Sequence, residues 1–393
     1  MLLELHGWLP DLIEAHLESL DFLFPQWVSA RASSDYAWAE LARMEERIEA
    51  NLDALVLAGD EAEALIEASL ASDSRGVVTA AALVSIRNGV LLFDAWDAAS
   101  PAAALAIGEA YGFATELAVL EPVLDSSSAA AVVGAAYALT LRGRKVAHEK
   151  LSPHLVDGPD RVRALAWRVM ADLVARSLAP AIARRTFEDA FADEAVADAA
   201  WWGAAWSRQS WLSGHATALA TRDVRALRCL AQLGGASDRA RVIEAMNTEA
   251  LGLTRFDAAA SLGQVDVADA LLIHVAAKDP ATAVAASRAF WRMTDQQKLL
   301  DASAQVLAPG EDDPDLAETV HLPDVAALKK WWSSARGAFA AGPRWARATD
   351  VDKAELTALD GEARTARFLR EVHGGKRAPE LALLERYPLV SRG

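Results

Sequence analysis

The segment Val162-Arg163-Ala164-Leu165-Ala166-Trp167 decides the fold, because three other parts of the chain repeat its pattern. Each copy starts with Val, continues with small or aliphatic residues, and ends with an aromatic residue or Cys; the copies are Val132–Tyr137, Val162–Trp167, Val196–Trp201 and Val224–Cys229. Their starts are 30, 34 and 28 residues apart. A unit of this length is too small to bury its own apolar face, so such units must stack on their neighbours.

The composition favours helices. Apolar residues make up 53% of the chain and aromatic residues only 7%, which suits close-packed helices better than sheets. Polar residues that can cap a helix N-terminus precede the repeats, near Asp73, Ser100, Ser127, Asp160, Asp193, Asp223, Thr248 and Asp279. We therefore predict an all-α protein: an α-solenoid of HEAT-like helical hairpin repeats, with a helical N-terminal cap and a C-terminal helical extension.

The sequence divides into four predicted parts. Residues 1–60 form the cap, with helices over 8–20 and 37–57, and residues 61–307 form the repeat solenoid. Residues 308–322 are an acidic linker, because prolines, a glycine and acids are hard to keep helical. Residues 323–393 form the extension, whose apolar tail from Leu381 to Val390 is expected to dock.

Charge is distributed unevenly along the chain, whose net charge is −16. Residues 1–125 carry 22 Asp or Glu against 5 Lys or Arg, whereas residues 126–310 carry 19 against 21. No segment has the basic excess that neutralises phosphates, so nucleic acid is not an expected partner. The acidic third is either a solvated surface or a docking surface for a basic partner, and Glu61, Glu63 and Glu67 are the candidate docking cluster.

Several features point to a cytoplasmic protein. Cys229 is the single cysteine and cannot form an internal disulfide, and the first residues lack the basic region of a secretory signal. No uncharged apolar run reaches the roughly 20 residues that a membrane span needs. We expect no membrane association, and the oligomeric state stays open.

No sequence motif indicates catalysis, a cofactor or a metal. His148 and His154 are six residues apart with Pro153 between them, so they share no helical face and no zinc site is expected. Cys229 occupies the repeat position that Trp167 holds in its own copy. We therefore predict a buried thiol and not a nucleophile.

Tryptophan gives the sharpest binding signal. There are 13, and Trp201, Trp202, Trp206 and Trp211 fall within eleven residues. Trp202 and Trp206 share one helical face, whereas Trp201 points about 100° away from Trp202. With Arg208 beside them, this pair is a candidate partner-binding strip, although packing between repeats explains it equally well. Further along, Trp331 and Trp332 are expected to anchor the C-terminal segment to the last repeat.

The ends of the chain resemble a known family. The stretches 8–27 and 41–55, the motif Lys330-Trp-Trp332 and the stretch 341–345 are similar to an uncharacterised bacterial family of HEAT-repeat proteins. Its members tend to be encoded near type VI secretion genes, beside PAAR-type spike-tip proteins. The resemblance implies an adaptor, chaperone or immunity-like protein for a secreted effector, and it names no functional residue. Near its end this chain departs from the family, which usually carries a longer basic and Ala-rich helix there.

These observations predict a non-enzymatic protein-binding scaffold whose partner is a secreted effector or a spike-associated protein. Two alternatives stay open: an enzyme of the lyase or glycosylase type on a HEAT-like scaffold, or a structural subunit of a larger assembly. A deep pocket with a buried carboxylate beside Trp202 or Trp206 would favour the enzyme. The oligomer mass in solution would identify the structural subunit.

Overall fold

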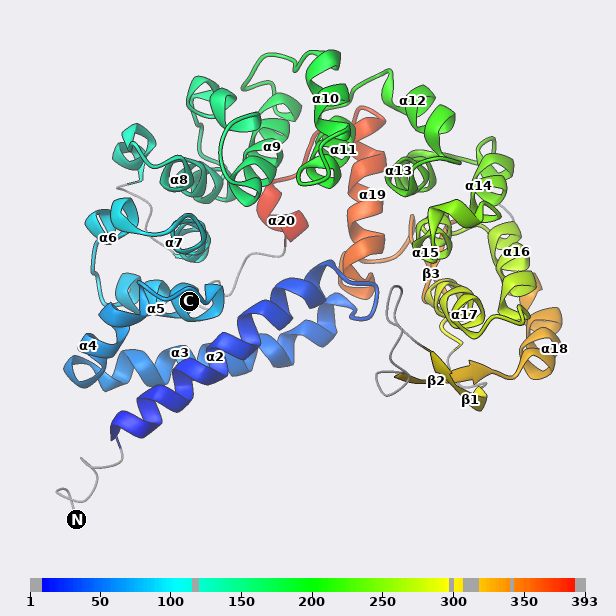
Figure 1. Ribbon diagram of the computed structural model, residues 1–393, viewed down its shortest axis with the longest axis horizontal. Coiled ribbons are helices and arrows are strands. Elements are labelled where there is room, and N and C mark those ends of the chain that lie inside the picture. The colour runs from blue at the N-terminus through cyan, green and yellow to red at the C-terminus, as the bar shows by residue number, and fades with distance from the viewer. Residues whose placement is uncertain (1–8, 115–119, 297–299, 307–317, 340–342, 386–393) are drawn as a thin grey trace. The chain divides into compact units, whose positions relative to one another are not determined.

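The computed structural model describes residues 9–114, 120–296, 300–306, 318–339 and 343–385, and this part of the chain is mostly helical (Figure 1). The described residues also form two short two-stranded sheets. Because helices make up most of this part of the chain, the predicted helical class is confirmed. The chain forms two compact units. Unit 1 holds residues 1–208 and 374–393, and unit 2 holds residues 209–373. The predicted four-part division follows the repeats and does not coincide with these units, because the C-terminal residues return to unit 1.

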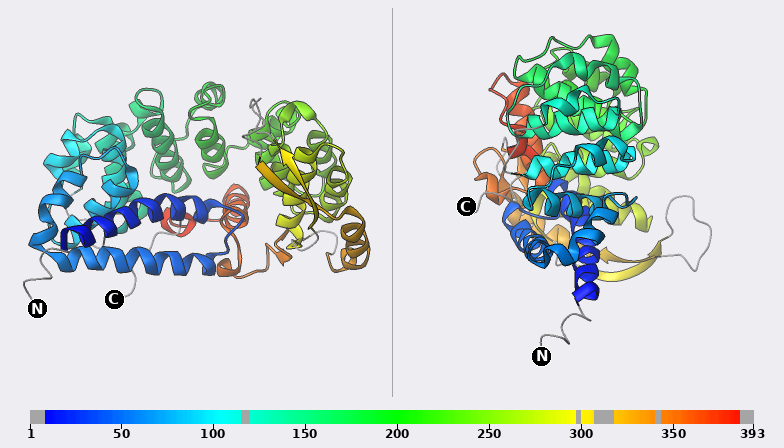
Figure 2. Two further views of the ribbon diagram at one scale, coloured as in Figure 1. Left: turned by 60° about the horizontal axis from the view of Figure 1, so that its bottom comes forward. Right: turned by 90° about the vertical axis from the view of Figure 1, so that its left-hand side faces the viewer.

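Unit 1 begins with two long helices that lie side by side, α2 (Leu9–Ala32) and α3 (Ala42–Ala58), joined through the short 3-10 helix η1 (Trp38–Leu41) (Figure 2). The predicted end of the first helix near residue 20 is wrong, because α2 continues through Pro25. Leu20, Phe24 and Trp27 are buried at helical spacing, and this apolar stripe extends the helix past the proline. Trp8 lies outside the described residues.

Shorter helices follow in unit 1 as far as residue 208: α4 (Asp60–Ser69), α5 (Arg75–Arg87), α6 (Phe93–Ala98), α7 (Pro101–Phe113), η2 (Glu121–Asp125), α8 (Ala129–Leu141), η3 (His148–Lys150), η4 (Ser152–Leu155), α9 (Asp160–Ala175), α10 (Arg184–Phe191) and α11 (Ala197–Trp206). Helices α5, α7, α8, α9 and α11 contact one another in succession. Small residues permit these contacts. A Cβ atom on Gly108 would lie 2.6 Å from the Cα of Gly134, so α7 and α8 pack backbone to backbone.

Unit 2 continues with α12 (Leu212–Leu219), α13 (Val224–Leu233), α14 (Arg239–Met246), η5 (Glu249–Leu251), α15 (Thr254–Ala260), α16 (Val265–Val275), α17 (Pro280–Thr294), β1 (Leu300–Val306), β2 (Glu318–Pro323), α18 (Val325–Ala335), η7 (Arg336–Ala338), β3 (Trp345–Ala346), β4 (Thr349–Asp350), η8 (Leu356–Ala358) and α19 (Gly361–His373). Helices α13, α15 and α17 contact one another in succession. Strand β1 pairs antiparallel with β2, and β3 pairs antiparallel with β4.

Strand β2 corrects the predicted linker. Residues 308–317 of that linker lie outside the described residues, and residues 318–322 belong to a strand. The pair Thr319 and Val320 is β-branched and favours extended backbone, whereas the linker was inferred from the prolines and acids that precede it. The following helix α18 anchors this region as expected. Trp332 is buried, its ring lies 5.2 Å from that of Phe290, and its Nε1 donates to Asp269 Oδ1 over 2.8 Å.

The aligned repeat positions all face the interior of their own unit. Tyr137, Trp167 and Trp201 are buried in unit 1, and Cys229 is buried in unit 2. The predicted burial of Cys229 is therefore confirmed, and the other three aligned positions are buried as well.

The C-terminal residues finish unit 1 with the short helix α20 (Leu381–Glu385), which contacts α8. Leu381 and Leu384 are buried. Docking of the apolar tail is thus confirmed for residues 381–385, and residues 386–390 lie outside the described residues. Within the described ranges, no helix combines the length and the apolar character that crossing a bilayer requires.

Candidate functional site

The predicted tryptophan strip is only partly at the surface. Trp202 and Trp206 stack with ring centroids 5.1 Å apart, as two residues on one helical face should. Trp206 is fully buried at the end of α11, which contacts α9, and its Nε1 donates to Asp172 Oδ1 over 3.1 Å. The exposed Trp202/Trp206 strip is therefore corrected to Trp202 alone. That ring is half-buried, with the Arg168 guanidinium 4.9 Å from its centroid.

Arg208 follows α11 and binds the chain's own C-terminal residues. Its Nη2 donates to the backbone oxygen of Lys376 over 2.6 Å. Its backbone has a φ of 61°, in the left-handed region that ends the helix and turns the side chain. The role of Trp202 and Arg208 in binding a partner stays a prediction, but Arg208 already makes a peptide contact within unit 1.

The carboxylate of Glu385 is the centre of a buried ionic cluster in unit 1. Arg168 Nη2 lies 2.6 Å from its Oε1, and the Tyr137 hydroxyl donates to its Oε2 over 2.7 Å. Arg31 lies 3.7 Å from Oε2 and also donates to the backbone oxygen of Glu385 over 3.1 Å. Burial raises the pKa of Glu385, but Arg168, Arg31 and the tyrosine outweigh it and hold this pKa below its usual range. The carboxyl group is thus ionised and bound by three side chains.

The residues between Lys376 and Glu385 pass the ends of α11 and α8. Arg208 at the end of α11 holds Lys376. Glu380 lies near the end of α8, where its Oε1 would be 3.5 Å from a Cβ on Gly143. Glu385 then contacts Arg31 of α2, Tyr137 of α8 and Arg168 of α9 through the ionic cluster.

Asp172 is a second buried carboxylate, and it lies beside Trp206. Its side chain has no exposed surface, and Arg176 Nη1 is 3.4 Å from its Oδ2. Burial raises the pKa of Asp172 to about 6, against the hydrogen bond from Trp206 and the charge of Arg176. The enzyme alternative requires a deep pocket with a buried carboxylate beside Trp202 or Trp206. Asp172 is such a carboxylate, beside Trp206.

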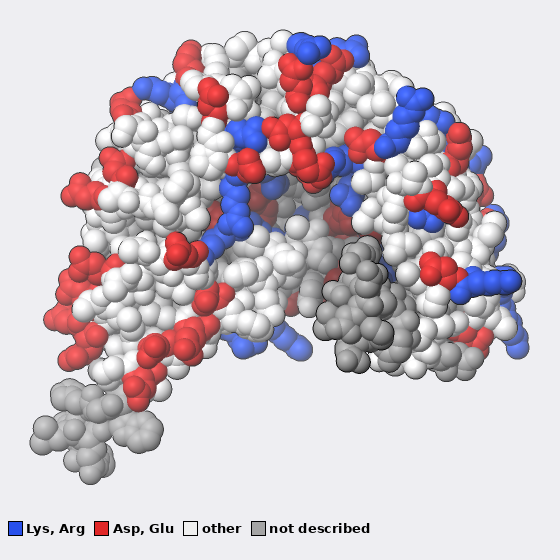
Figure 3. All heavy atoms as spheres, viewed as in Figure 1, with Lys and Arg blue, Asp and Glu red and all other residues white. Residues whose placement is uncertain are grey.

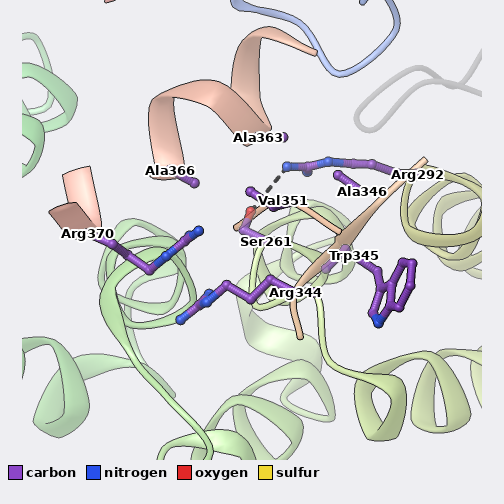
Figure 4. A pocket seen from close by; sticks show the side chains of 11 residues that line it. Ser261, Arg292, Arg344, Trp345, Ala346, Val351, Ala363, Ala366 and Arg370 are labelled. Atoms are coloured by element: carbon purple, nitrogen blue, oxygen red, sulfur yellow. Dashed lines mark hydrogen bonds between the residues drawn. The ribbon is translucent and has the colours of Figure 1, made fainter. Parts of the chain in front are cut away.

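A small pocket of unit 2 is lined by three arginines, Arg292, Arg344 and Arg370 (Figure 4). Arg344 is buried and donates to backbone oxygens at the ends of two helices: Ala231 at 2.9 Å, Leu262 at 3.2 Å, and Gly234. Burial, together with the charge of Arg370, lowers the pKa of Arg344 to about 9. Figure 4 shows both side chains reaching toward the same end of the pocket.

The other two arginines of this pocket are paired with acids of unit 2. Arg292 lies 2.5 Å from Asp257 and 2.6 Å from Glu362, and Arg370 lies 2.8 Å from Asp352. All three cations of the pocket therefore bind the protein's own groups. The arrangement ties α13, α15, α17 and α19 together and leaves little capacity for a ligand.

The predicted acidic cluster lies on α4. Glu61, Glu63 and Glu67 are exposed, and within the described ranges no Lys, Arg or His lies within ion-pair distance of them. Two leucines of α3 and α4 are also exposed: Leu57 at the end of α3 by 86% and Leu65 on α4 by 37%. Figure 3 shows acidic side chains gathered over α3 and α4.

The remaining candidates are structural. Cys229 is buried, and burial raises the pKa of its thiol to about 12, so the predicted buried thiol is confirmed. His148 and His154 lie in the separate short helices η3 and η4. In the part of the chain that the structure describes, no group of three or more His, Cys, Asp or Glu side chains could hold a metal ion.

Sequence reasoning missed Glu385 and Asp172. The only local signal for Glu385 is its place directly after the buried Leu384. No protein-family model, curated protein or solved structure matches this chain.

Proposed function

We propose that this chain is a HEAT-like helical-repeat scaffold that binds another protein. Two successions of contacting helices support a repeat architecture: α5, α7, α8, α9 and α11 in unit 1, and α13, α15 and α17 in unit 2. Burial of all four aligned positions supports the repeat architecture further. Stacked repeats of this kind present broad surfaces suited to folded partners or helices.

The corner formed by α3 and α4 carries the proposal. Leu57 and Leu65 expose apolar surface there, beside the exposed glutamates Glu61, Glu63 and Glu67 of α4. Apolar side chains rimmed by charge are typical of a protein interface, and the charges set the rate of capture. The partner surface that fits this corner is apolar at its centre and basic at its rim.

The partner class comes from the family resemblance. It is a secreted effector or a spike-associated protein, which the chain would serve as adaptor, chaperone or immunity-like partner. A structural role in a larger assembly predicts a stable oligomer in solution, which a mass measurement distinguishes from this proposal.

The test measures binding of the purified chain to type VI effector and PAAR-type spike proteins, the partner class that the family resemblance implies. Replacing Glu61, Glu63 and Glu67 by Gln should slow association several-fold at low ionic strength and leave the melting temperature unchanged, because rim charges act mainly on the association rate. The matched control replaces three dispersed, exposed acids: Asp94→Asn, Asp157→Asn and Glu249→Gln.

A larger decrease in association rate for the Glu61/Glu63/Glu67 variant than for the control variant would support the corner on α3 and α4 as the docking surface. An unchanged rate and salt dependence in the Glu61/Glu63/Glu67 variant would show that this corner is only a solvated surface. Failure of the wild-type chain to bind any of these proteins would contradict the partner class.

A further inference from the structure

The C-terminal segment, residues 376–385, is bound to unit 1 in the manner of a peptide ligand. Its one helix, α20, has five residues, and its polar contacts are made by side chains that project from other helices. Arg208 binds its backbone at one end, and Arg31, Tyr137 and Arg168 bind its carboxylate at the other. We call the surface made by these four side chains the segment-binding surface.

The side chains that the segment buries form a short helical recognition pattern. Leu381, Leu384 and Glu385 are buried and stand at positions i, i+3 and i+4, whereas Leu383 is half exposed. An amphipathic helix binds a protein surface through apolar anchors at this spacing. The pattern Leu-x-x-Leu-Glu therefore describes what the surface accepts.

The charges of the surface call for an acid. Arg31 is buried together with Glu385, and Arg168 lies at the same carboxylate. If the segment left, both guanidinium groups would lose the carboxylate of Glu385, and the Tyr137 hydroxyl would lose its hydrogen bond to that carboxylate. Without the segment, the surface would carry the positive charges of Arg31 and Arg168 next to the apolar surface that Leu381 and Leu384 cover.

The surface also has hydrogen-bonding capacity that the segment does not use. The buried Nε1 of Trp202 and Nε of Arg168 have no acceptor among the described residues. Both atoms belong to side chains that stack on each other beside Glu385. A peptide that carries an additional acceptor could satisfy them, which the described part of the segment does not.

We propose that the segment-binding surface is a peptide-binding site, which the chain's own segment occupies at rest and which takes a short acidic helical peptide, Leu-x-x-Leu-Glu, from a protein partner in exchange. A tethered segment acts at a high effective concentration, so a moderate affinity keeps it in place. Exchange leaves no arginine unpaired, because the incoming glutamate replaces Glu385. This site goes beyond the proposed corner on α3 and α4 and stands without it.

The test uses a fluorescent peptide with the sequence of residues 376–385 and the full-length chain. The double variant Leu381→Asp and Leu384→Asp changes only the segment and should release it. This variant should bind the peptide at least about tenfold more tightly than the wild type, whose surface is occupied. A peptide with the Glu385→Gln change, and the double variant with Arg168→Gln added, should each lose most of this binding.

A double variant that keeps its circular dichroism spectrum but binds no peptide, or binds both peptides equally, would overturn the proposal. If the double variant does not fold, the single variant Glu385→Gln serves, because it keeps both leucines; it must then bind the wild-type peptide more tightly than the wild-type chain does. A wild-type dimer that dissociates in either variant would place the segment on a second copy and would also overturn it.

Discussion

Two buried arginines, Arg31 of unit 1 and Arg344 of unit 2, are held by different kinds of partner. In unit 1, Arg31 meets the carboxylate of Glu385, which lies 354 residues further along the chain. In unit 2, Arg344 donates to backbone oxygens, among them those of Ala231 and Leu262. Carbonyls at helix ends are fixed by the helix and carry its negative dipole end, whereas a carboxylate on a five-residue helix can move away. On this account the charge of Arg344 is locked in the fold of unit 2, whereas the charge of Arg31 is held by a segment that can exchange.

The largest expected effect concerns the aligned repeat positions, which hold aromatic residues in unit 1 and Cys229 in unit 2. Trp167→Ala and Trp201→Ala should each cost about 3–5 kcal/mol of unfolding free energy, because each removes a large buried ring. Cys229→Ala, at the corresponding position of unit 2, should cost about 1 kcal/mol or less. Denaturant unfolding measures all three. Tryptophan variants as stable as Cys229→Ala would show that the aligned positions do not hold unit 1 together.

The next effect tests whether Arg344 is locked in unit 2. Arg344→Met keeps much of the side-chain volume but leaves several buried carbonyl oxygens without donors, which should cost about 3 kcal/mol. Arg288→Met, an exposed change on α17 in the same unit, is the control and should stay within about 0.5 kcal/mol of the wild type. Equal unfolding free energies for the two variants would remove the contrast between the units.

A smaller, pH-dependent effect should appear in both units. Burial raises the pKa of Asp172 in unit 1 and of Asp360 in unit 2 to about 6. The folded state then binds a proton that the unfolded state releases, so each carboxyl's contribution to stability falls as the pH rises from about 4 to about 6. Asp172→Asn and Asp360→Asn do not titrate. Each should gain about 2 kcal/mol relative to the wild type between about pH 4 and about pH 7.

Thermal melts across this pH range would measure these differences. A difference between wild type and variant that stays constant with pH would show that the carboxyl group is not perturbed. A gain in one unit only would locate the perturbation there.

The sequence predicts what depends on local spacing. The repeat of Val162 and Trp167 at later positions fixes which helical face is buried, and the structure buries it. Trp202 and Trp206 do share a face, as four-residue spacing requires. Which of the two is exposed depends on Asp172 and α9, and no local pattern encodes that contact.

Other features could not be predicted because they depend on distant partners. The predicted helix over residues 8–20 ends before Pro25, but apolar packing carries α2 through this proline. Strand β2 requires a partner strand that lies before the acidic stretch. The contact between Arg31 and Glu385 joins the two ends of unit 1, and only Leu381 and Leu384 signalled that the tail would dock.

Hydrogen exchange on the full-length Glu385→Gln variant tests the exchangeable charge of unit 1 most directly. The account predicts that amides of residues 376–385 lose protection, since Arg31 and Arg168 lose the anion that holds the segment, while amides of α13 in unit 2 keep theirs. Unchanged protection of residues 376–385 would contradict it, because the segment would then be a fixed part of the fold.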